Sequence, residues 1–358
     1  MKSSYKDFFE NYFKEELQED EEHHKKINSA ISEGDEKTSL NLTMKKFIKE
    51  SQTNNFWFDW FYKQKSQKFG RYKRELVNYK WSDIESEIKF CVKHISEYYF
   101  NELKEESSDN QKIICAMNAR EAKETEESQK KPSRNEFFNL LINDLKEVEL
   151  EFVNYLNEVI KSENEYESKS KRLFLKLYED KINDNQKFED TNTISFNYTT
   201  LPDDFEFSKH VTNIHGTLKG KDIIFGIDSF DLSSKEYQLI NKFSKTYRLM
   251  RLKRENLNIS PDTDIIKFYG HSLGEADYSY FQTIFDIVNL YSGETKLIFY
   301  FSVYGGKTLE EVEEEVFERV WLLIKKYGAT LENKDHGKNL IHKLQLENRL
   351  LIKKIEFD

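Results

Sequence analysis

Glycine and proline, the residues on which tight turns depend, are concentrated in the second half of this chain of 358 residues. Of its 12 glycines only Gly34 and Gly70 precede Gly216, and of its three prolines only Pro132 precedes Pro202. Closely spaced strands need turns that contain such residues. The first half therefore lacks the turn residues that a β-sheet needs, and we expect it to be helical.

Apolar residues in the first half recur at intervals of three and four. One series starts at Trp81 and continues at Ile84, Ile88, Cys91, Ile95, Tyr98 and Leu103, and another follows Arg134 at Phe137, Leu141, Leu145, Val148, Phe152, Leu156 and Val159. This spacing is typical of long amphipathic helices that bury one stripe. Residues 105–132 between the two series are polar and rich in Glu, Lys and Ser, which predicts a solvated connection.

After about residue 190 the pattern changes to short apolar runs that alternate with longer amphipathic segments. We expect strands at residues 193–198, 211–214, 223–227, 264–269, 296–303 and 351–357, and helices at 233–256, 275–291 and 308–327. Strands that alternate with helices predict an α/β fold with a mostly parallel sheet covered on both faces. The chain should thus divide into a helical unit at residues 1–190 and an α/β unit at residues 191–358.

The composition limits the partners and the cellular setting. With 55 basic and 65 acidic side chains, the net charge of −10 disfavours nucleic acid as a bulk partner. The two cysteines, Cys91 and Cys115, do not form a CxxC pair, and no histidine lies in a convincing metal-ligand set. No run approaches the ~20 apolar residues of a membrane span. We expect a cytoplasmic protein that holds no metal and does not cross a membrane.

Three polar segments follow expected strands, at Ser195–Thr199, Asn213–Gly216 and Tyr269–Glu275. Open α/β sheets bind ligands beyond the carboxyl ends of their strands, and a helix that starts there offers unpaired backbone N–H groups. The third segment has the order strand, glycine turn and helix. We therefore expect the three segments to surround one pocket.

Four motifs occur in this order: Ser195–Thr199, Asn213–Gly216, Phe225–Asp228 and Tyr269–Asp277. They resemble the bacteriophage abortive-infection AbiH family, and Lys2–Phe8 and Trp81–Glu85 are similar to it as well. The resemblance implies a role in phage defence, with a phage or host protein as the trigger. Members of that family begin with a strand and a Gly-Asn-Gly-Phe-Asp loop. Because Met1 falls within that motif, we expect the first strand and its glycine-rich loop to be lacking here.

The AbiH family is in turn distantly similar to the sirtuin-like NAD-binding fold. This implies a Rossmann-like sheet and NAD, or a related nucleotide, as substrate or ligand. His215 would be the general base, and Asn197 would hold a ribose hydroxyl or the attacking water. The nucleotide would be bound by Gly216, Gly270, His271, Ser272, Leu273 and Asp277, and the site would be supported by Trp81, Asp83 and Glu85.

Other interpretations of these residues stay open. His215 can be a histidine packed in a turn and Asn197 an Asx-turn residue, in which case the chain would be a nucleotide-binding or infection-sensing module without catalysis. Asp83 and Glu85 can supply favourable charge to the first turn of a helix. The helical stripes also leave pairing between two copies of the chain open.

Two further patterns carry less weight. Gly270 to Gly274 matches the Gly-x-Ser-x-Gly elbow of serine hydrolases, with Ser272 as nucleophile. The acid would then have to be Asp277, Asp286 or Asp335, and the histidine His336 or His342. A serine hydrolase normally has most of its sheet before the nucleophile, whereas the first half of this chain is expected to be helical. The basic residues Lys245, Arg248, Arg251, Lys253 and Arg254 predict a solvated helix face more than a phosphate or nucleic-acid site.

Overall fold

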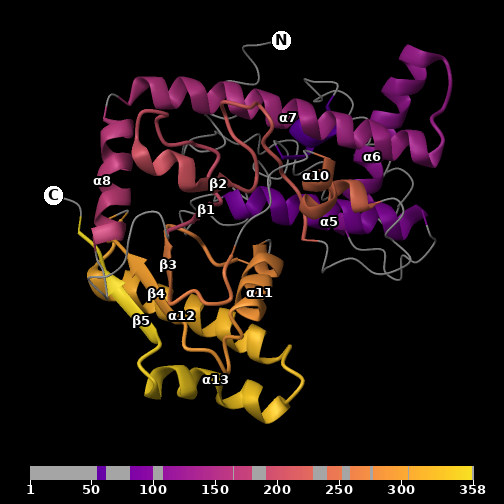
Figure 1. Cartoon of the computed structure of the whole chain (residues 1–358). Helices are drawn as coiled ribbons and strands as arrows, with labels where there is room; N and C mark the ends of the chain where they lie inside the picture. Colours follow the sequence, from indigo (N-terminus) through magenta and orange to yellow (C-terminus); the bar gives the residue numbers. More distant parts are fainter. Residues whose placement is uncertain are drawn as a thin grey trace. The chain divides into compact units, whose positions relative to one another are not determined.

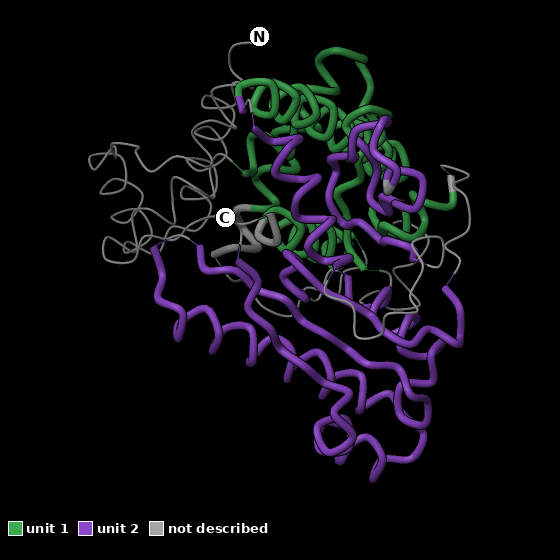
Figure 2. The backbone as a smooth tube through the Cα atoms, turned by 60° about the vertical axis from the view of Figure 1, so that its left-hand side comes forward, with its two compact units in different colours: residues 1–162, 218–252 green, residues 163–217, 253–358 purple. Residues whose placement is uncertain are grey.

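The computed structural model describes residues 55–61, 81–99, 108–163, 165–179, 191–228, 240–251, 259–274, 277–304 and 306–356. The chain forms two compact units that interleave along the sequence, as Figure 2 shows. Unit 1 comprises residues 1–162 and 218–252, and unit 2 comprises residues 163–217 and 253–358. The domain boundary expected near residue 190 stays a prediction.

The described part of unit 1 is mostly helical, as predicted. Its helices are α5 (Trp81–Tyr99), α6 (Ser108–Ser128), α7 (Arg134–Ser162) and α10 (Lys245–Arg251), with a short 3-10 helix, η4 (Asn241–Phe243), before α10. Helix α7 begins with a capping box, in which the Ser133 N–H donates to Glu136 and the Glu136 N–H donates to the Ser133 hydroxyl. Both long helices expected from the apolar spacing are confirmed.

The predicted stripes of α5 and α7 form much of the core of unit 1. Ile84, Ile88, Cys91 and Ile95 on α5 and Phe137, Leu141, Leu145, Val148 and Phe152 on α7 are each at most 2% exposed. Aromatic side chains from residues 56–61 complete this core, because the Trp57 indole N–H donates to the Leu141 carbonyl oxygen at 2.7 Å and its ring lies 5.9 Å from that of Phe243. Burial of such large apolar side chains is the main stabilising term of a helical unit.

The solvated connection expected at residues 105–132 is wrong, because Ser108–Ser128 forms helix α6. Five apolar residues within two turns of this helix are each at most 2% exposed: Ile113, Cys115, Ala116, Met117 and Ala119. The Arg120 guanidinium also lies 2.9 Å from the Asp144 carboxylate of α7. The helix was not predicted because its buried residues occupy only positions 113–119, and most of the other residues of Ser108–Ser128 are polar or charged.

The solvated basic face expected near residue 245 is also wrong for its first two members. Lys245 is 2% exposed, and its Nζ lies 2.8 Å from Glu85 of α5. Arg248 binds Glu149 of α7 through two nitrogens and donates to the Phe225 carbonyl oxygen at 2.8 Å. Lys253 and Arg254 lie outside the described residues. These cations therefore hold α10 to the helical core of unit 1.

The strand expected at residues 223–227 is absent, since only Ile227 forms an isolated bridge, with Ser244. The Phe225 N–H donates to the Glu149 carboxylate at 2.7 Å, while the Phe225 carbonyl oxygen accepts from Arg248. Side chains thus satisfy backbone groups that would otherwise need a neighbouring strand.

Unit 2 has the α/β character that the sequence predicted. Its strands are β1 (Thr193–Ser195), β2 (Val211–Asn213), β3 (Ile265–Tyr269), β4 (Lys296–Phe301) and β5 (Leu350–Lys354). Strand β1 pairs with β2, and β3, β4 and β5 form a second sheet in that order (Figure 1). All these pairs are parallel. The parallel strands are confirmed, whereas a Rossmann-like arrangement stays a prediction.

Helices lie on both faces of the β3-β4-β5 sheet. Helices α11 (Tyr278–Ile287), α12 (Leu309–Gly328) and α13 (Lys334–Leu346) share a core with Leu297 and Phe299 of β4. On the other face Ile298 and Tyr300 pack with Leu177 of α8 (Tyr166–Glu179). The remaining described helix of unit 2 is the 3-10 helix η2 (Glu206–His210). This alternation along β4 follows from the two-residue period of a strand.

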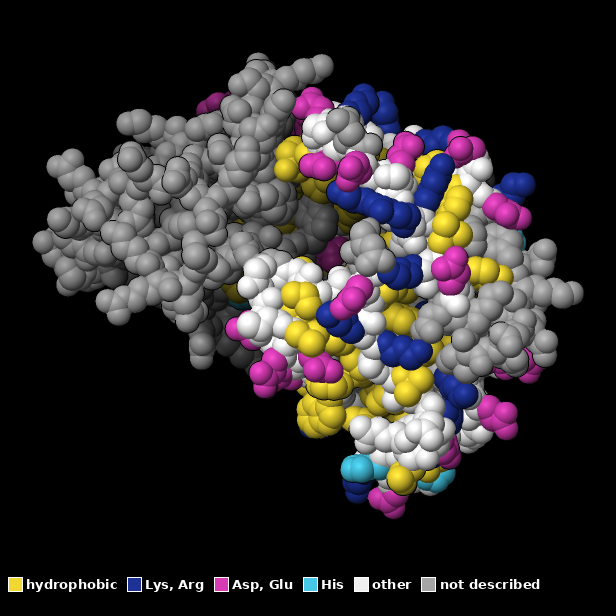
Figure 3. Space-filling model, turned by 90° about the vertical axis from the view of Figure 1, so that its left-hand side faces the viewer, with side chains coloured by type: hydrophobic (Ala, Val, Ile, Leu, Met, Phe, Trp, Pro, Cys, Tyr) yellow, Lys and Arg dark blue, Asp and Glu magenta, His cyan; other side chains and the backbone are white. Residues whose placement is uncertain are grey.

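Basic and acidic side chains are interspersed on the face shown in Figure 3. Within the described helices of unit 2, some oppositely charged residues one turn apart form ion pairs, such as Glu315 with Arg319 and Lys343 with Glu347. Among the described helices, none combines the length and the apolar composition that crossing a bilayer requires.

We predict that Arg248→Met destabilises the protein by about 3–5 kcal/mol, because the buried Glu149 carboxylate would lose its cationic partner. Burial already raises the pKa of Glu149, against the opposing effect of Arg248. Without Arg248 that pKa rises further, so the deficit should shrink as the pH is lowered from 7 toward the ordinary glutamate pKa of about 4.3. Urea unfolding at several pH values measures both effects.

Lys161→Met, on the exposed end of α7, is the matched control and should change stability by less than about 0.5 kcal/mol. Equal losses in the two variants, or a loss in Arg248→Met that grows on acidification, would contradict the assignment.

Candidate functional site

The three polar segments identified in the sequence follow the carboxyl ends of β1, β2 and β3 in unit 2. Parallel pairing of β1 with β2 places the first two side by side, and the Asn213 side-chain amide donates to the carbonyl oxygens of Asn197 at 2.7 Å and Thr199 at 3.0 Å. Gly216 and Gly270 have φ values of +98° and +68°. These left-handed conformations favour glycine and allow the chain to turn sharply after β2 and β3.

The carboxylate of Asp277 lies between two histidines. Its Oδ1 is 3.2 Å from His215 Nε2, and its Oδ2 is 3.2 Å from His271 Nε2. Asp277 is the N-cap residue of α11, yet its side chain does not cap that helix. A carboxylate at this position usually accepts from the first backbone N–H groups of the helix. Here it instead joins the turns after β2 and β3.

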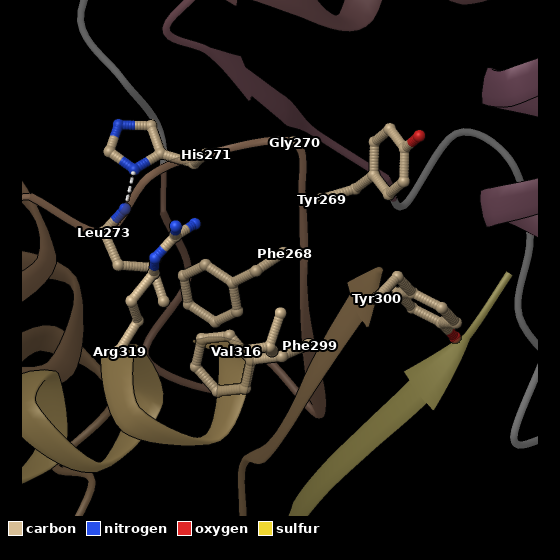
Figure 4. Close-up of a pocket in the computed structure, with 9 residues that line it drawn as sticks. All are labelled: Phe268, Tyr269, Gly270, His271, Leu273, Phe299, Tyr300, Val316 and Arg319. Carbon is tan, nitrogen blue, oxygen red and sulfur yellow. Dashed lines mark hydrogen bonds between the residues drawn. The ribbon is translucent and has the colours of Figure 1, made fainter. Parts of the chain in front are cut away.

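The protonation state of His271 follows from its second nitrogen. The backbone N–H of Leu273 donates to His271 Nδ1 at 2.8 Å, shown as the dashed line in Figure 4. Since Nδ1 accepts, the ring proton resides on Nε2, which faces Asp277 Oδ2. His271 is therefore neutral and donates to Asp277. Leu273 has a φ of +55°, a conformation that few non-glycine residues adopt, and the bond to His271 helps to hold it.

Aromatic rings enclose this cluster of His215, Asp277 and His271. The Phe196 ring centroid lies 5.5 Å from that of His215 and 4.3 Å from that of His271. Tyr280 of α11 lies 5.7 Å from His215. His215 is 3% exposed, so the rings and the surrounding chain leave little room for water around the cluster. Exclusion of water strengthens the electrostatic interaction between the carboxylate and the imidazoles.

Sequence reasoning missed Phe196 and Tyr280 and did not predict the shared role of Asp277. Phe196 lies inside the Ser195–Thr199 motif, in which only Asn197 was predicted to have a role. An aspartate at the expected start of a helix looks like an ordinary cap. Only the contacts across the fold distinguish it.

Not every predicted site residue belongs to the cluster. Asn197 and Ser272 are exposed, and in the described part of unit 2 the hydrogen-bonded cluster does not include their side chains. Trp81, Asp83 and Glu85 lie on α5 in unit 1. The side chains of Trp81 and Asp83 lie outside the described residues, and Glu85 binds Lys245. The roles predicted for all five stay predictions.

Two of the residues that could complete a serine hydrolase site have other contacts. Asp286 accepts from the Tyr327 hydroxyl at 2.9 Å, and the His336 ring stacks on that of Tyr291 at 4.0 Å. Leu273, next to Ser272, donates to His271 from its backbone. These contacts count against the interpretation of Gly270 to Gly274 as a nucleophile elbow.

A hollow of about 30 Å³ adjoins the cluster at the carboxyl ends of β3 and β4 (Figure 4). Its lining comes from both strands, from the turn with Gly270, His271 and Leu273, and from Val316 and Arg319 of α12. Phe268 and Phe299 stack with their centroids 4.3 Å apart. This volume is well below the roughly 300–1,000 Å³ of ligand pockets and has room for about one or two water molecules. Within the described residues, no group of three or more His, Cys, Asp or Glu side chains is arranged to hold a metal ion.

The family model described as Bacteriophage abortive infection AbiH matches residues 1–300 of the chain. This range includes the three polar segments and the whole His215, Asp277 and His271 cluster. Helices α12 and α13 and strand β5 follow it. Searches of the curated proteins and of the solved structures found no match.

We predict that Asp277→Ala lowers stability by about 1–3 kcal/mol, because it removes the acceptor of the His271 Nε2 proton and the carboxylate beside buried His215. Asp277→Asn should lose less, since its amide oxygen can still accept from His271. Urea unfolding measures these differences.

Asp262→Ala, which alters an exposed side chain of the same unit, is the control. If Asp277→Ala were no less stable than this control, the carboxylate would not join the two turns.

Proposed function

Since this chain belongs to the bacteriophage abortive infection AbiH family, whose role is defence against phage, we propose that it binds and hydrolyses NAD or a related nucleotide. The reaction would take place in unit 2, beyond the carboxyl ends of β1, β2 and β3. The observation that supports this most strongly is the Asp277 carboxylate held between His215 and His271. A histidine oriented by a carboxylate is the common arrangement of a general base.

In this proposal the Asp277 carboxylate, 3.2 Å from His215 Nε2, orients the ring of His215, which acts as the general base. His215 would take a proton from water as the water oxygen bonds to the ribose carbon that carries nicotinamide. The carbon–nitrogen bond breaks, and nicotinamide leaves as a neutral molecule with the bonding electron pair. The Asp277 carboxylate would stabilise the imidazolium that forms.

Access is the main requirement of this mechanism. His215 is 3% exposed, so the turn that carries His271 has to move for water and the ribose to reach the ring. The same turn contains Gly270 and Gly274, and Gly270 has open space around the position of a Cβ atom. Exposed Asn197 and Ser272 would then meet the ribose hydroxyls or phosphates, with Gly216 allowing close approach of the backbone.

A second candidate function is a nucleotide-binding or infection-sensing module without catalysis. The burial of His215 beneath Phe196 and Tyr280 favours it, because a structural histidine needs no access to water. In this case a phage or host protein would act as the trigger, and nucleotide binding would report the state of the infected cell. A cytoplasmic location suits either function.

We predict that purified protein releases nicotinamide from NAD and that His215→Ala reduces the rate by about 100-fold or more, the usual contribution of a general base. Ser272→Ala should weaken turnover only modestly, because its role would be in binding. Chromatographic measurement of nicotinamide gives the rates. The matched control is His342→Ala, which removes an exposed imidazole of α13 and should leave the rate unchanged.

The outcomes distinguish hydrolysis of NAD from binding without catalysis. NAD binding without turnover supports the non-catalytic module, and absence of both binding and turnover contradicts both functions. Phage plating on cells that express each variant links the chemistry to defence. Protection that survives His215→Ala would show that defence does not depend on the proposed base.

A further inference from the structure

Helix α12 buries one face against the β3-β4-β5 sheet and exposes large apolar side chains on the opposite face. The buried side chains share a core with Leu297 and Phe299 of β4, and they are Val320, Leu323, Ile324 and Tyr327. On the other face Phe317, Trp321 and Leu322 are 49%, 47% and 57% exposed. Phe317 and Trp321 are one turn apart and Leu322 follows directly, so the three form one patch, the α12 patch. Exposed apolar side chains that cluster in this way are typical of an interaction site.

Charged residues of opposite sign lie on the two sides of the α12 patch. Glu310 and Glu314 are exposed toward the amino end of the helix, and Lys325 is exposed toward its carboxyl end. The Lys325 ammonium lies 4.3 Å from the centre of the Trp321 ring, which keeps its charge on this face. Glu318 is exposed within the patch itself. From the amino to the carboxyl end, the face is therefore acidic, then apolar, then basic.

This order is complementary to itself when two copies of the helix run antiparallel. A two-fold axis through the middle of the patch would place Phe317 of one copy opposite Leu322 of the other, and Glu314 opposite Lys325. Each contact would occur twice, because the two sides of a two-fold interface are the same surface. In a parallel pair each charged residue would instead meet its own counterpart, and like charges repel. The charge pattern therefore favours the antiparallel arrangement.

The same register gives the acid within the patch a partner. Glu318 of one copy would lie opposite Trp321 of the other. The indole N–H is a donor that a carboxylate can accept. These two hydrogen bonds would offset the repulsion between the two Glu318 side chains near the axis.

We propose that this face is the interface of a homodimer, in which the α12 helices of two copies pack antiparallel. A second copy is the occupant that fits, because the acidic, apolar and basic parts of the face match their own two-fold image. The proposal does not depend on NAD chemistry, since no residue of the His215, Asp277 and His271 cluster takes part. Helix α12 also follows residues 1–300, the range that the family model matches.

Sedimentation equilibrium of the full chain over a range of concentrations tests the proposal. The wild type should dimerise with a dissociation constant on the order of 1–100 μM, because one pair of helices buries less area than a standard interface. Trp321→Ala should weaken dimerisation by about 10-fold or more, as expected for an aromatic side chain at the centre of an interface. The matched control is Leu346→Ala, which truncates an apolar side chain of α13 that is 86% exposed and should leave the dissociation constant unchanged.

A charge exchange tests the antiparallel register. Glu314→Lys and Lys325→Glu each place like charges opposite one another in the homodimer, so each should weaken association by about 10-fold. An equimolar mixture of the two variants should regain wild-type association, because both contacts then join opposite charges. Each change affects one exposed side chain, and thermal melting verifies that every variant folds.

Several results would overturn the proposal. A wild-type chain that sediments as a monomer at every concentration shows that the face does not bind a second copy. A dimer that Trp321→Ala leaves unchanged, or that Leu346→Ala weakens equally, forms through another surface. A mixture of the two charge variants that associates no better than either alone contradicts the antiparallel pairing.

Discussion

The candidate site depends on one carboxylate. Asp277 faces His215 after β2 and His271 after β3, so it joins the start of α11 to the ends of two strands that are far apart in the sequence. Its effect relies on the tautomer of His271, which the Leu273 N–H fixes by donating to Nδ1. If that bond were lost, His271 could place its proton on either nitrogen, and the orientation of the cluster would no longer be unique.

Unit 1 uses the same principle for a structural purpose. Glu149 and Arg248 satisfy both backbone groups of Phe225, so these groups need no neighbouring strand. Glu85 and Lys245 form a second ion pair in the same unit. Breaking such pairs by removal of one partner is strongly destabilising. The charges that make this chain look highly solvated in sequence are thus partly internal.

The proposed chemistry assigns different tasks to neighbouring groups. His215 would accept the proton, Asp277 would orient the His215 ring and stabilise its positive charge, and Asn197 and Ser272 would bind the ribose hydroxyls or phosphates. Such a separation lets binding and proton transfer be altered independently by substitution. The turn that carries His271 combines Gly270 at φ +68° with Leu273 at +55°, a conformation that is strained for a leucine.

The sequence by itself determined the local structure: the three- and four-residue spacing gave α5 and α7, and the short apolar runs gave the parallel strands, because both depend on neighbours along the chain. It also placed His215, His271 and Asp277 in polar segments after strands. It failed for α6, whose buried residues are limited to positions 113–119 of a mostly charged helix, and it did not indicate α13. Only the tertiary structure decided that Asp277 lies between the histidines and that Lys245 and Arg248 are internal, because those contacts join residues whose separation in sequence carries no periodic signal.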